Sequence, residues 1–480
     1  MVFSSLLFVF AFLASQLLIY FLVRNTKARN IVLLVFSLIF YAWGGPKYLF
    51  LLLGECFISF FTAREIGRSR FQKMKKRWLR LDLILMFGLL LFFKYTGFIF
   101  TNIKLLTGWP EEIPSIVLPI GISFYTFQLV SYVADVYRGD VKAQEKYWKV
   151  LLYAGLFHQC IAGPIVRYST VAEEIEERHA SLKDVCYGIR RFSIGLAKKA
   201  ILANGCASIA DQILSADQAG LSGVSTGSMW LGMFAYMLQI YLDFSAYSDM
   251  AIGMGRMVGF HYLENFDYPY SAHSVQNFWR KWHISLSTFF RDYVYIPLGG
   301  NRKGIARTIF NMFIVWALTG MWHGASWNYI LWGLYYFVFL TAERLFLGKL
   351  LDKNAVTRGL GHIYTLLVVF FGWVLFKFTD NASLLEVFRG LFGVNHALTS
   401  PETLSILVNN FVFLLVAVLS VFPLGKLIRA ELNEKSRRRG NSGLADCLRF
   451  FDAVYPLVLL VLSVLALVGN SYNPFLYFQF

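Results

Sequence analysis

Long apolar runs separated by short basic stretches make up most of the chain. Residues 3–23 (FSSLLFVFAFLASQLLIYFLV) and 455–469 (YPLVLLVLSVLALVG) contain no charged side chain, and a helix of about 20 apolar residues crosses a membrane. No basic stretch precedes the first run and no small-residue cleavage site follows it, so we expect a retained span rather than a signal peptide. The pattern predicts an all-α polytopic membrane protein with roughly 11 to 13 transmembrane or re-entrant helices.

The basic stretches indicate how the chain threads through the bilayer. By the positive-inside rule the cation-rich stretches face the cytoplasm, and cation-poor ones such as 215–228 and 469–480 face outward. The runs then alternate, with the N-terminus outside, except that residues 149–167 begin and end in basic stretches. We therefore predict that this segment re-enters the membrane, with a turn at Gly163 and Pro164. The basic stretches are 24–29, 64–80, 138–149, 167–199, 280–307, 344–358 and 426–449.

Composition supports the membrane assignment. The 480 residues are 57% hydrophobic and only 15% charged, whereas a soluble domain of this size carries far more charge. The excess of 45 Lys and Arg over 29 acidic residues is typical of loops that face anionic lipid, so no nucleic-acid partner is expected. The five cysteines are scattered without a CxxC pair, which predicts neither a disulfide framework nor a metal site.

An ionisable residue interrupts the apolar pattern in the peptide TGMWHGASW. From Arg307 an apolar run of about 16 residues, roughly 24 Å of helix, leads to His323, and the chain then returns. We predict a helical hairpin over residues 308–342 with His323 near its apex. Gly320 and Gly324 would let a substrate or another backbone approach. A histidine at membrane depth is a candidate functional residue, the alternative being a packed histidine with one hydrogen bond.

A second histidine lies in the basic segment 278–304. Its aromatic and aliphatic residues recur with the i, i+3, i+4, i+7 spacing of an amphipathic helix, and Arg280 and Arg291 share another face. The pattern predicts an interfacial helix at the cytoplasmic surface, with His283 near its apolar, tryptophan-lined side. A basic amphipathic anchor without a chemical role is the alternative. The apolar positions are Phe278, Trp279, Trp282, Leu286, Phe289, Phe290 and Tyr293.

Several long blocks carry a family resemblance. They resemble the signature blocks of the membrane-bound O-acyltransferase superfamily, and within it the bacterial branch of the alginate O-acetylation and peptidoglycan O-acetyltransferase membrane proteins. The resemblance covers nearly the whole chain and implies one membrane domain, residues 1–480, with helices around a central funnel or tunnel. The blocks are LPIGISFYTFQLVSYVADVYRGD (118–140), AGPIVRY (162–168), LDFSAYSDMAIGMGRMVGF (242–260), ENFDYPY (264–270), FWRKWHISLSTFFRDYVYIPLGGNR (278–302) and MWHGASW (321–327).

The resemblance implies acyl transfer from a cytoplasmic thioester, acetyl-CoA, to a hydroxyl beyond the membrane, with no permanently bound cofactor. His323 corresponds to the family's catalytic histidine and His283 to the second motif residue. Histidine suits this role because it titrates near neutral pH. The basic segment would hold the phosphates of coenzyme A, since Arg binds phosphate in a bidentate manner. The candidates are Arg280, Lys281, Arg291 and Arg302.

Three further polar residues, Asp243, Asp249 and Asn277, are expected to support the site. Either acid could orient a histidine. In a competing interpretation His323 and these acids form the proton relay of a transporter or flippase, and in a third the protein is a scaffold that recruits an enzyme. The glycines of GMGRMVG (253–259) do not follow a strand, so we expect helix-packing positions rather than a nucleotide-binding loop.

The expected physiological role is O-acetylation of a cell-surface polysaccharide, such as alginate, peptidoglycan or another exopolysaccharide. The resemblance implies a multi-pass protein of the bacterial cytoplasmic membrane, with an extracytoplasmic SGNH-type or similar acetyltransferase as partner. The related D-alanyl transfer protein of teichoic acid modification shares the WH-SLS and WHG blocks. It ranks second because it lacks the SDMAIG and IPLGGNR blocks present in this chain.

The C-terminal residues 470–480 end in NPFLYFQF and resemble the aromatic tail of this branch. After a final span the tail is expected outside the membrane. Its rings would settle in an aromatic belt, or Tyr477 would act as a covalent relay. A phenyl ester has a good leaving group and stays transferable, so such a relay would carry an acetyl group outward without coenzyme A.

Overall fold

A computed structural model describes residues 1–108, 116–159, 163–215, 217–439 and 442–469, and in this part the chain forms helices and no strand. The α-helices are α1 (Ala14–Leu22), α2 (Thr26–Trp43), α3 (Pro46–Arg68), α4 (Gln72–Thr107), α5 (Ile122–Arg138), α6 (Tyr147–Gly155), α7 (Tyr168–Glu176), α8 (Leu182–Ala197), α9 (Asn204–Ile213), α10 (Gln218–Ser222), α11 (Thr226–Met257), α12 (Val275–Lys281), α13 (Ile284–Phe290), α14 (Gly304–His323), α15 (Trp327–Ala342), α16 (Gly348–Leu351), α17 (Ala355–Lys377), α18 (Asn381–Leu391), α19 (Pro401–Ser420), α20 (Leu424–Arg439) and α21 (Ser442–Gly469). Short π- or 3₁₀-helical turns are η1 (Leu7–Leu13), η2 (Lys198–Ala203), η3 (Pro269–Ser271), η4 (Arg291–Tyr295) and η5 (Glu343–Leu347).

Seven helical stretches of the described chain are long and apolar enough to cross a membrane, which confirms the prediction of an all-α polytopic protein. They are α2, α4, α14, the stretch from α15 to α16, α17, α19 and α21. The predicted total of 11 to 13 also counted short and re-entrant helices. One of these is α6, which has nine residues and is therefore too short to cross. It overlaps the segment 149–167 at residues 149–155, and the re-entry of this segment stays a prediction.

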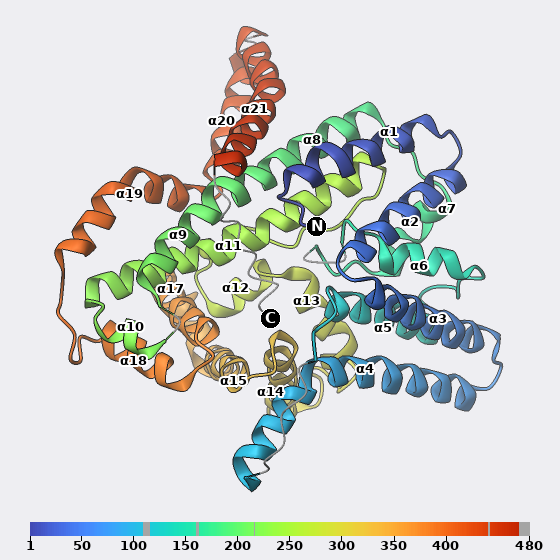
Figure 1. Cartoon of the computed structure of the whole chain (residues 1–480), viewed down its shortest axis with the longest axis horizontal. Helices are drawn as coiled ribbons and strands as arrows, with labels where there is room; N and C mark the ends of the chain where they lie inside the picture. Colours follow the sequence, from blue (N-terminus) through green and yellow to red (C-terminus); the bar gives the residue numbers. More distant parts are fainter. Residues whose placement is uncertain (109–115, 160–162, 216, 440–441, 470–480) are drawn as a thin grey trace.

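The centre of the fold is the long helix α11, which is buried along most of its 32 residues. It runs beside α8 across the molecule (Figure 1). The two backbones approach closely because glycines face each other: a Cβ atom on Gly188 of α8 would lie 2.6 Å from the carbonyl oxygen of Gly253 on α11. Small residues permit such contacts between helices in membranes. Gly253 is thus a packing residue, as predicted.

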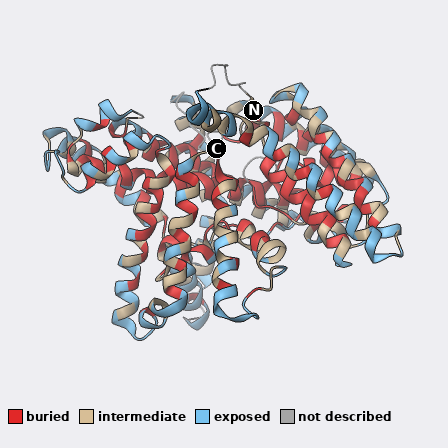
Figure 2. Cartoon of the chain, turned by 90° about the horizontal axis from the view of Figure 1, so that it is seen from below, coloured by how far each residue is buried: buried red, intermediate tan, exposed pale blue. Residues whose placement is uncertain are grey.

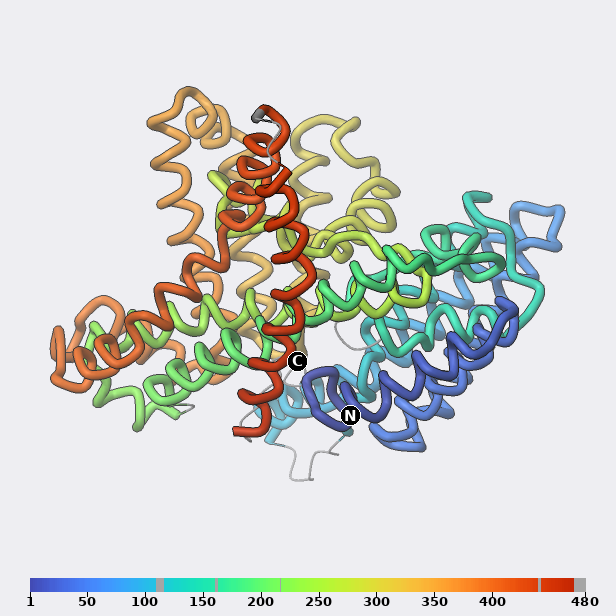
Figure 3. The backbone as a smooth tube through the Cα atoms, turned by 90° about the horizontal axis from the view of Figure 1, so that it is seen from above, coloured from blue at the N-terminus to red at the C-terminus, as the bar shows by residue number. Residues whose placement is uncertain are grey.

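The hairpin of α14 and α15 is held together in the same way. A Cβ atom on Gly320 would lie 2.4 Å from the carbonyl oxygen of Tyr329, and one on Gly333 would lie 2.4 Å from that of Trp316. The hairpin and α17 rise together on one side of the molecule (Figure 3). Buried residues concentrate where these helices reach the middle of the protein, and exposed residues dominate their outer ends (Figure 2). His323 lies at the buried end.

The expected single amphipathic helix over residues 278–304 is wrong. Helix α12 ends at Lys281, Trp282 is extended, and His283 adopts the left-handed conformation with φ 44° before α13 begins. The helix breaks because the backbone N–H of Ile284 donates to the backbone oxygen of Asn265 at 2.9 Å, outside the helix. The helical spacing of apolar residues persists because α12 and α13 both bury aromatic side chains in the same core.

The close contact within the α14–α15 hairpin generates a prediction. In Gly320→Ala the new methyl group overlaps the Tyr329 carbonyl oxygen, so we expect the protein to lose about 1–3 kcal/mol of stability and to unfold at a lower temperature in detergent. Gly88→Ala on α4 is the matched control, because no atom lies within 4 Å of its Cβ position, and its melting temperature should stay level or rise. Equal melting temperatures for the two variants would contradict this account of the packing.

Candidate active site

His323 is the last residue of α14 and is 7% exposed. Its imidazole lies among aromatic rings, with ring centroids 4.8 Å from Trp332 on α15 and 5.2 Å from Phe376 on α17. Within the described parts of the chain, its ring nitrogens have no hydrogen-bond partner. Within the described residues the imidazole is therefore held in position by packing against aromatic rings.

Helix α4 supports the turn that carries His323. The hydroxyl of Tyr95 donates to the backbone oxygen of Met321 at 2.5 Å and also approaches that of Gly324 at 3.3 Å, and the Lys94 ammonium donates to the backbone oxygen of Trp322. The last carbonyls of a helix lack partners within the helix and favour a nearby cation. This support was not predicted from the sequence, although a lysine inside an apolar run, here Lys94, indicates a polar partner within the protein.

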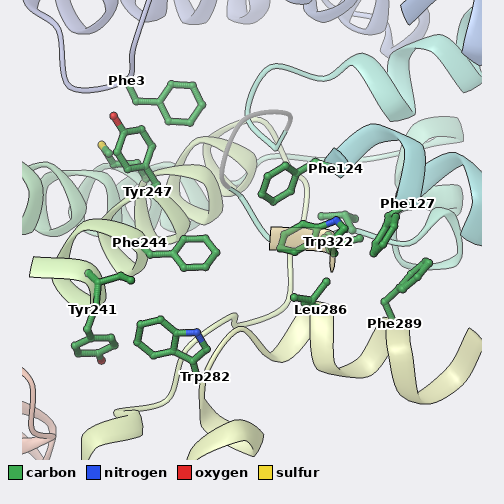
Figure 4. Packing of buried hydrophobic residues seen from close by; sticks show 14 of the residues in the cluster. Phe3, Phe124, Phe127, Tyr241, Phe244, Tyr247, Trp282, Leu286, Phe289 and Trp322 are labelled. Atoms are coloured by element: carbon green, nitrogen blue, oxygen red, sulfur yellow. The ribbon is translucent and has the colours of Figure 1, made fainter. Parts of the chain in front are cut away.

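His283 is buried at 1% exposure between α12 and α13. Its ring centroid lies 4.7 Å from that of Phe244 on α11 and 5.8 Å from that of Trp322. The Trp322 ring in turn lies 5.0 Å from His323, so the two histidines meet at one indole. Figure 4 shows Trp322 surrounded by other aromatic side chains of the core. The fold thus brings together two histidines that are 40 residues apart in the sequence.

A cavity of about 530 Å³ lies among α12, α13 and α14 and is lined by aromatic and cationic side chains. Two of the four predicted donor-binding residues, Arg280 and Arg291, line it together with Arg344, which the sequence analysis missed. Its wall also includes Trp316 and Thr319 of α14, and Thr319 precedes His323 by about one helical turn. The cavity has the size of a small-molecule site, and neither histidine is among the residues that line it.

The other two predicted donor residues lie elsewhere. The ammonium of Lys281 donates to the Ser271 hydroxyl at 2.9 Å. Arg302 is exposed in the turns between η4 and α14, and neither residue lines the cavity.

A second cavity, of about 960 Å³, lies on the other side of η4. Its arginines are already engaged: Arg167 pairs with Asp292 at 2.6 Å, and Arg138 donates to the backbone oxygen of Asp292 at 2.9 Å. Burial acts to raise the pKa of Asp292, but hydrogen bonds from Arg291 and Arg167 hold that pKa below its usual value. In the smaller cavity Arg291 also pairs with Asp292, at 2.6 Å. Arg280 and Arg344 form no ion pair within the described residues, so the smaller cavity suits an anionic ligand better.

The predicted supporting polar residues have mainly structural partners. Asp243 on α11 pairs with Lys199 at 2.9 Å, where both side chains are almost fully buried. Asp249 pairs with Arg191 at 2.6 Å and with Lys198 at 2.7 Å. Both acids thus form ion pairs with cations of α8 and η2. Asn265, which was not singled out from the sequence, lies with its side-chain oxygen 3.2 Å from Nδ1 of His283.

Asn277 and Tyr477 are the remaining predicted site residues. Asn277 lies in the first turn of α12, where its backbone N–H donates to the Ser274 hydroxyl at 3.0 Å. Tyr477 and the rest of the tail 470–480 lie outside the described residues, so the relay stays a prediction.

Known proteins resemble the chain along all or part of its length. The model of the MBOAT, membrane-bound O-acyltransferase family matches residues 146–385, which include both histidines. The chain is 37% identical to the probable alginate O-acetylase AlgI of Pseudomonas putida over all of both chains. It is 34% identical to the peptidoglycan O-acetyltransferase of Helicobacter pylori over 82% of this chain and 80% of that protein. It is 28% identical to the teichoic acid D-alanyltransferase of Bacillus subtilis over 54% of this chain and 68% of that protein.

The support from α4 generates a second prediction. Tyr95→Phe keeps the ring but removes the hydroxyl that donates to the backbone oxygen of Met321. We expect the free energy of unfolding to fall by about 1–2 kcal/mol, since a buried carbonyl loses a partner, as measured by thermal unfolding in detergent. Tyr262→Phe is the control, because the buried Tyr262 hydroxyl has no hydrogen-bond partner in the described chain. If Tyr95→Phe unfolds at the wild-type temperature, α4 does not stabilise the turn.

Proposed function

The chain belongs to the membrane-bound O-acyltransferase family and is an O-acyltransferase of the membrane, and from this premise we propose that it moves an acetyl group from a cytoplasmic thioester donor toward a cell-surface polysaccharide. His323 is the catalytic base in this proposal, and His283 is the second histidine of the reaction centre. The observation that carries the proposal is the meeting of both histidines at Trp322. An arginine-lined cavity, whose wall includes Thr319 about one helical turn before His323, supports it.

The chemistry is an acyl transfer between sulfur and oxygen. An acceptor hydroxyl attacks the thioester carbonyl carbon, a C–O bond forms, and the C–S bond breaks. His323 accepts the hydroxyl proton as the bond forms and returns it to the sulfur of the leaving thiolate. Histidine is suited to both steps because its pKa ordinarily lies near neutral. The packing of His323 between Trp332 and Phe376 supports this role, since it fixes the ring and excludes water.

The donor we propose is acetyl-CoA. Its phosphates would be held mainly by Arg280 and Arg344 at the cavity, with Arg291, which also pairs with Asp292, beside them, because guanidinium groups bind phosphate with paired hydrogen bonds. The acyl end would then reach along Trp316 and Thr319 toward His323. The arginines belong to basic stretches that the positive-inside rule assigns to the cytoplasm, where coenzyme A is found.

The acceptor polymer lies on the other side of the bilayer in this proposal. The relatives that align with most or all of the chain are named for alginate and for peptidoglycan, and both polymers are polysaccharides with free hydroxyls. We place the protein in the bacterial cytoplasmic membrane, with an extracytoplasmic SGNH-type or similar acetyltransferase completing the transfer. Tyr477 remains the proposed relay between the two, and its Tyr477→Phe variant separates a relay from an aromatic anchor.

D-alanyl transfer is the second candidate, because the teichoic acid enzyme of Bacillus subtilis also aligns with this chain. That alignment covers 54% of the chain, whereas the probable alginate O-acetylase aligns with all of it. The shared part supports common chemistry and favours acetyl over D-alanyl transfer. Membership of an acyltransferase family also favours an enzyme over the transporter and scaffold interpretations.

Removing the proposed base tests the catalytic role. In His323→Ala we expect transfer from radiolabelled acetyl-CoA to fall by about 10²- to 10⁴-fold, the usual contribution of a general base, while the protein stays folded and inserted. His362→Ala is the matched control, because His362 is an exposed histidine on α17. Near wild-type transfer by purified, folded His323→Ala would show that another residue is the base.

Neutralising the cavity arginines tests the donor site. In the double variant Arg280→Gln, Arg344→Gln the apparent KM for acetyl-CoA should rise by roughly tenfold or more, since each charge-assisted hydrogen bond contributes about 1.5–3 kcal/mol. The dependence of KM on salt should also weaken. Arg358→Gln, at an exposed arginine outside the cavity, should leave KM unchanged. An unchanged KM in the double variant would assign these arginines to lipid contacts.

A further inference from the structure

Asn265 is a fully buried asparagine between α11 and α12. Its side-chain oxygen lies 3.2 Å from Nδ1 of His283 and accepts from the backbone N–H and the hydroxyl of Ser285 at 3.2 and 2.8 Å. Its side-chain nitrogen donates to the Ser248 hydroxyl on α11 at 3.2 Å. Its backbone oxygen accepts from Ile284 N–H at 2.9 Å. One residue therefore contacts the histidine and both residues that follow it.

These contacts fix the orientation of the Asn265 amide. A backbone N–H only donates, so the side-chain atom that faces the Ser285 N–H is the oxygen and not the NH₂ group. The same oxygen faces Nδ1 of His283. The Ser285 hydroxyl gives its hydrogen to Asn265 at 2.8 Å and accepts from the backbone N–H of Ile165 at 3.0 Å. The Ser285 oxygen also lies 3.4 Å from Nδ1 of His283. Both oxygens near Nδ1, from Asn265 and Ser285, are therefore acceptors toward it.

We infer that Asn265 is a positioning residue that fixes the neutral tautomer of His283 with the hydrogen on Nδ1, so that Nε2 carries the lone pair and serves as the acceptor in the reaction centre. A nitrogen that faces an acceptor oxygen must carry the hydrogen. The same residue clamps the left-handed backbone at His283 through Ile284 and Ser285. Backbone conformations of this kind persist where surrounding contacts hold them.

Hydrogen-bond partners that orient metal-binding histidines contribute about 10- to 100-fold to affinity or activity, and we expect an effect of similar size here. The assignment of the tautomer depends only on the structure, whereas the contribution to catalysis rests on the proposed acyl transfer. The two parts therefore need separate measurements.

The first measurement is ¹⁵N NMR of the full-length protein, labelled at histidine and held in lipid nanodiscs. His283→Gln identifies the signals of His283. We expect a hydrogen on Nδ1 in the wild type, in Asn265→Asp, which keeps an acceptor oxygen, and in the control Ser248→Ala, which removes only the partner of the amide nitrogen. A wild-type spectrum with the hydrogen on Nε2 overturns the inference, whether or not any variant folds.

The second measurement compares kcat and KM for acetyl-CoA. Asn265→Leu removes the acceptor with little change in volume, so kcat should fall about 10- to 100-fold with KM unchanged, and the Nδ1 hydrogen should no longer be fixed. Asn265→Asp should restore kcat to within several-fold of the wild type. If the Asn265→Leu variant folds and keeps the wild-type kcat, the positioning role is overturned. The role is also overturned if Asn265→Asp lowers kcat as much as Asn265→Leu does. If the wild-type protein shows the hydrogen on Nδ1 but transfers no acetyl group, the proposed function is contradicted and the tautomer assignment is not affected.

Discussion

Polar backbone inside a membrane protein must find its hydrogen bonds within the protein, because hydrocarbon offers none. The chain between α11 and α14 meets this constraint at the centre of the fold, where α12 and α13 are short and irregular backbone separates them. Asn265 accepts from the backbone of Ile284 and Ser285. The Glu343 carboxylate, from the far end of α15, accepts from the backbone N–H of Val275 at 2.6 Å, in the first turn of α12. These side chains replace the partners that a continuous helix would supply.

The same constraint explains the ions buried around the central segment. Lys199 and Asp243 are almost fully buried and lie 2.9 Å apart, and a buried charge is tolerated only when it is paired. Asp249 forms ion pairs with two side chains, those of Arg191 and Lys198. All of these pairs join α11 to α8 or η2, so they fix the helix against which His283 packs through Phe244. The acids of the LDFSAYSD block therefore serve the site indirectly.

The sequence predicts the helices better than it predicts the contacts between them. A helix ending at His323 follows from an apolar run between Arg307 and His323, because helix length depends on local composition. The break at His283 does not follow, because Asn265 is a tertiary partner and the apolar spacing continues across the break. Tyr95 contacts Met321 from 226 residues away, which no local pattern encodes. Arg280 and Arg291 line one cavity, although the continuous helix on which their shared face was predicted is absent.

The two histidines differ in how they are held, and the difference bears on their roles. His283 has a hydrogen-bond acceptor at Nδ1, whereas His323 is held by packing alone within the described residues. A general base must gain and lose a proton in each cycle, so it needs a nitrogen that no protein group occupies. A histidine with a fixed acceptor at Nδ1 keeps one defined tautomer, which leaves the lone pair on Nε2. The packing around Trp322 therefore places side by side one histidine whose ring is oriented by aromatic contacts and one whose tautomer is fixed by a hydrogen bond.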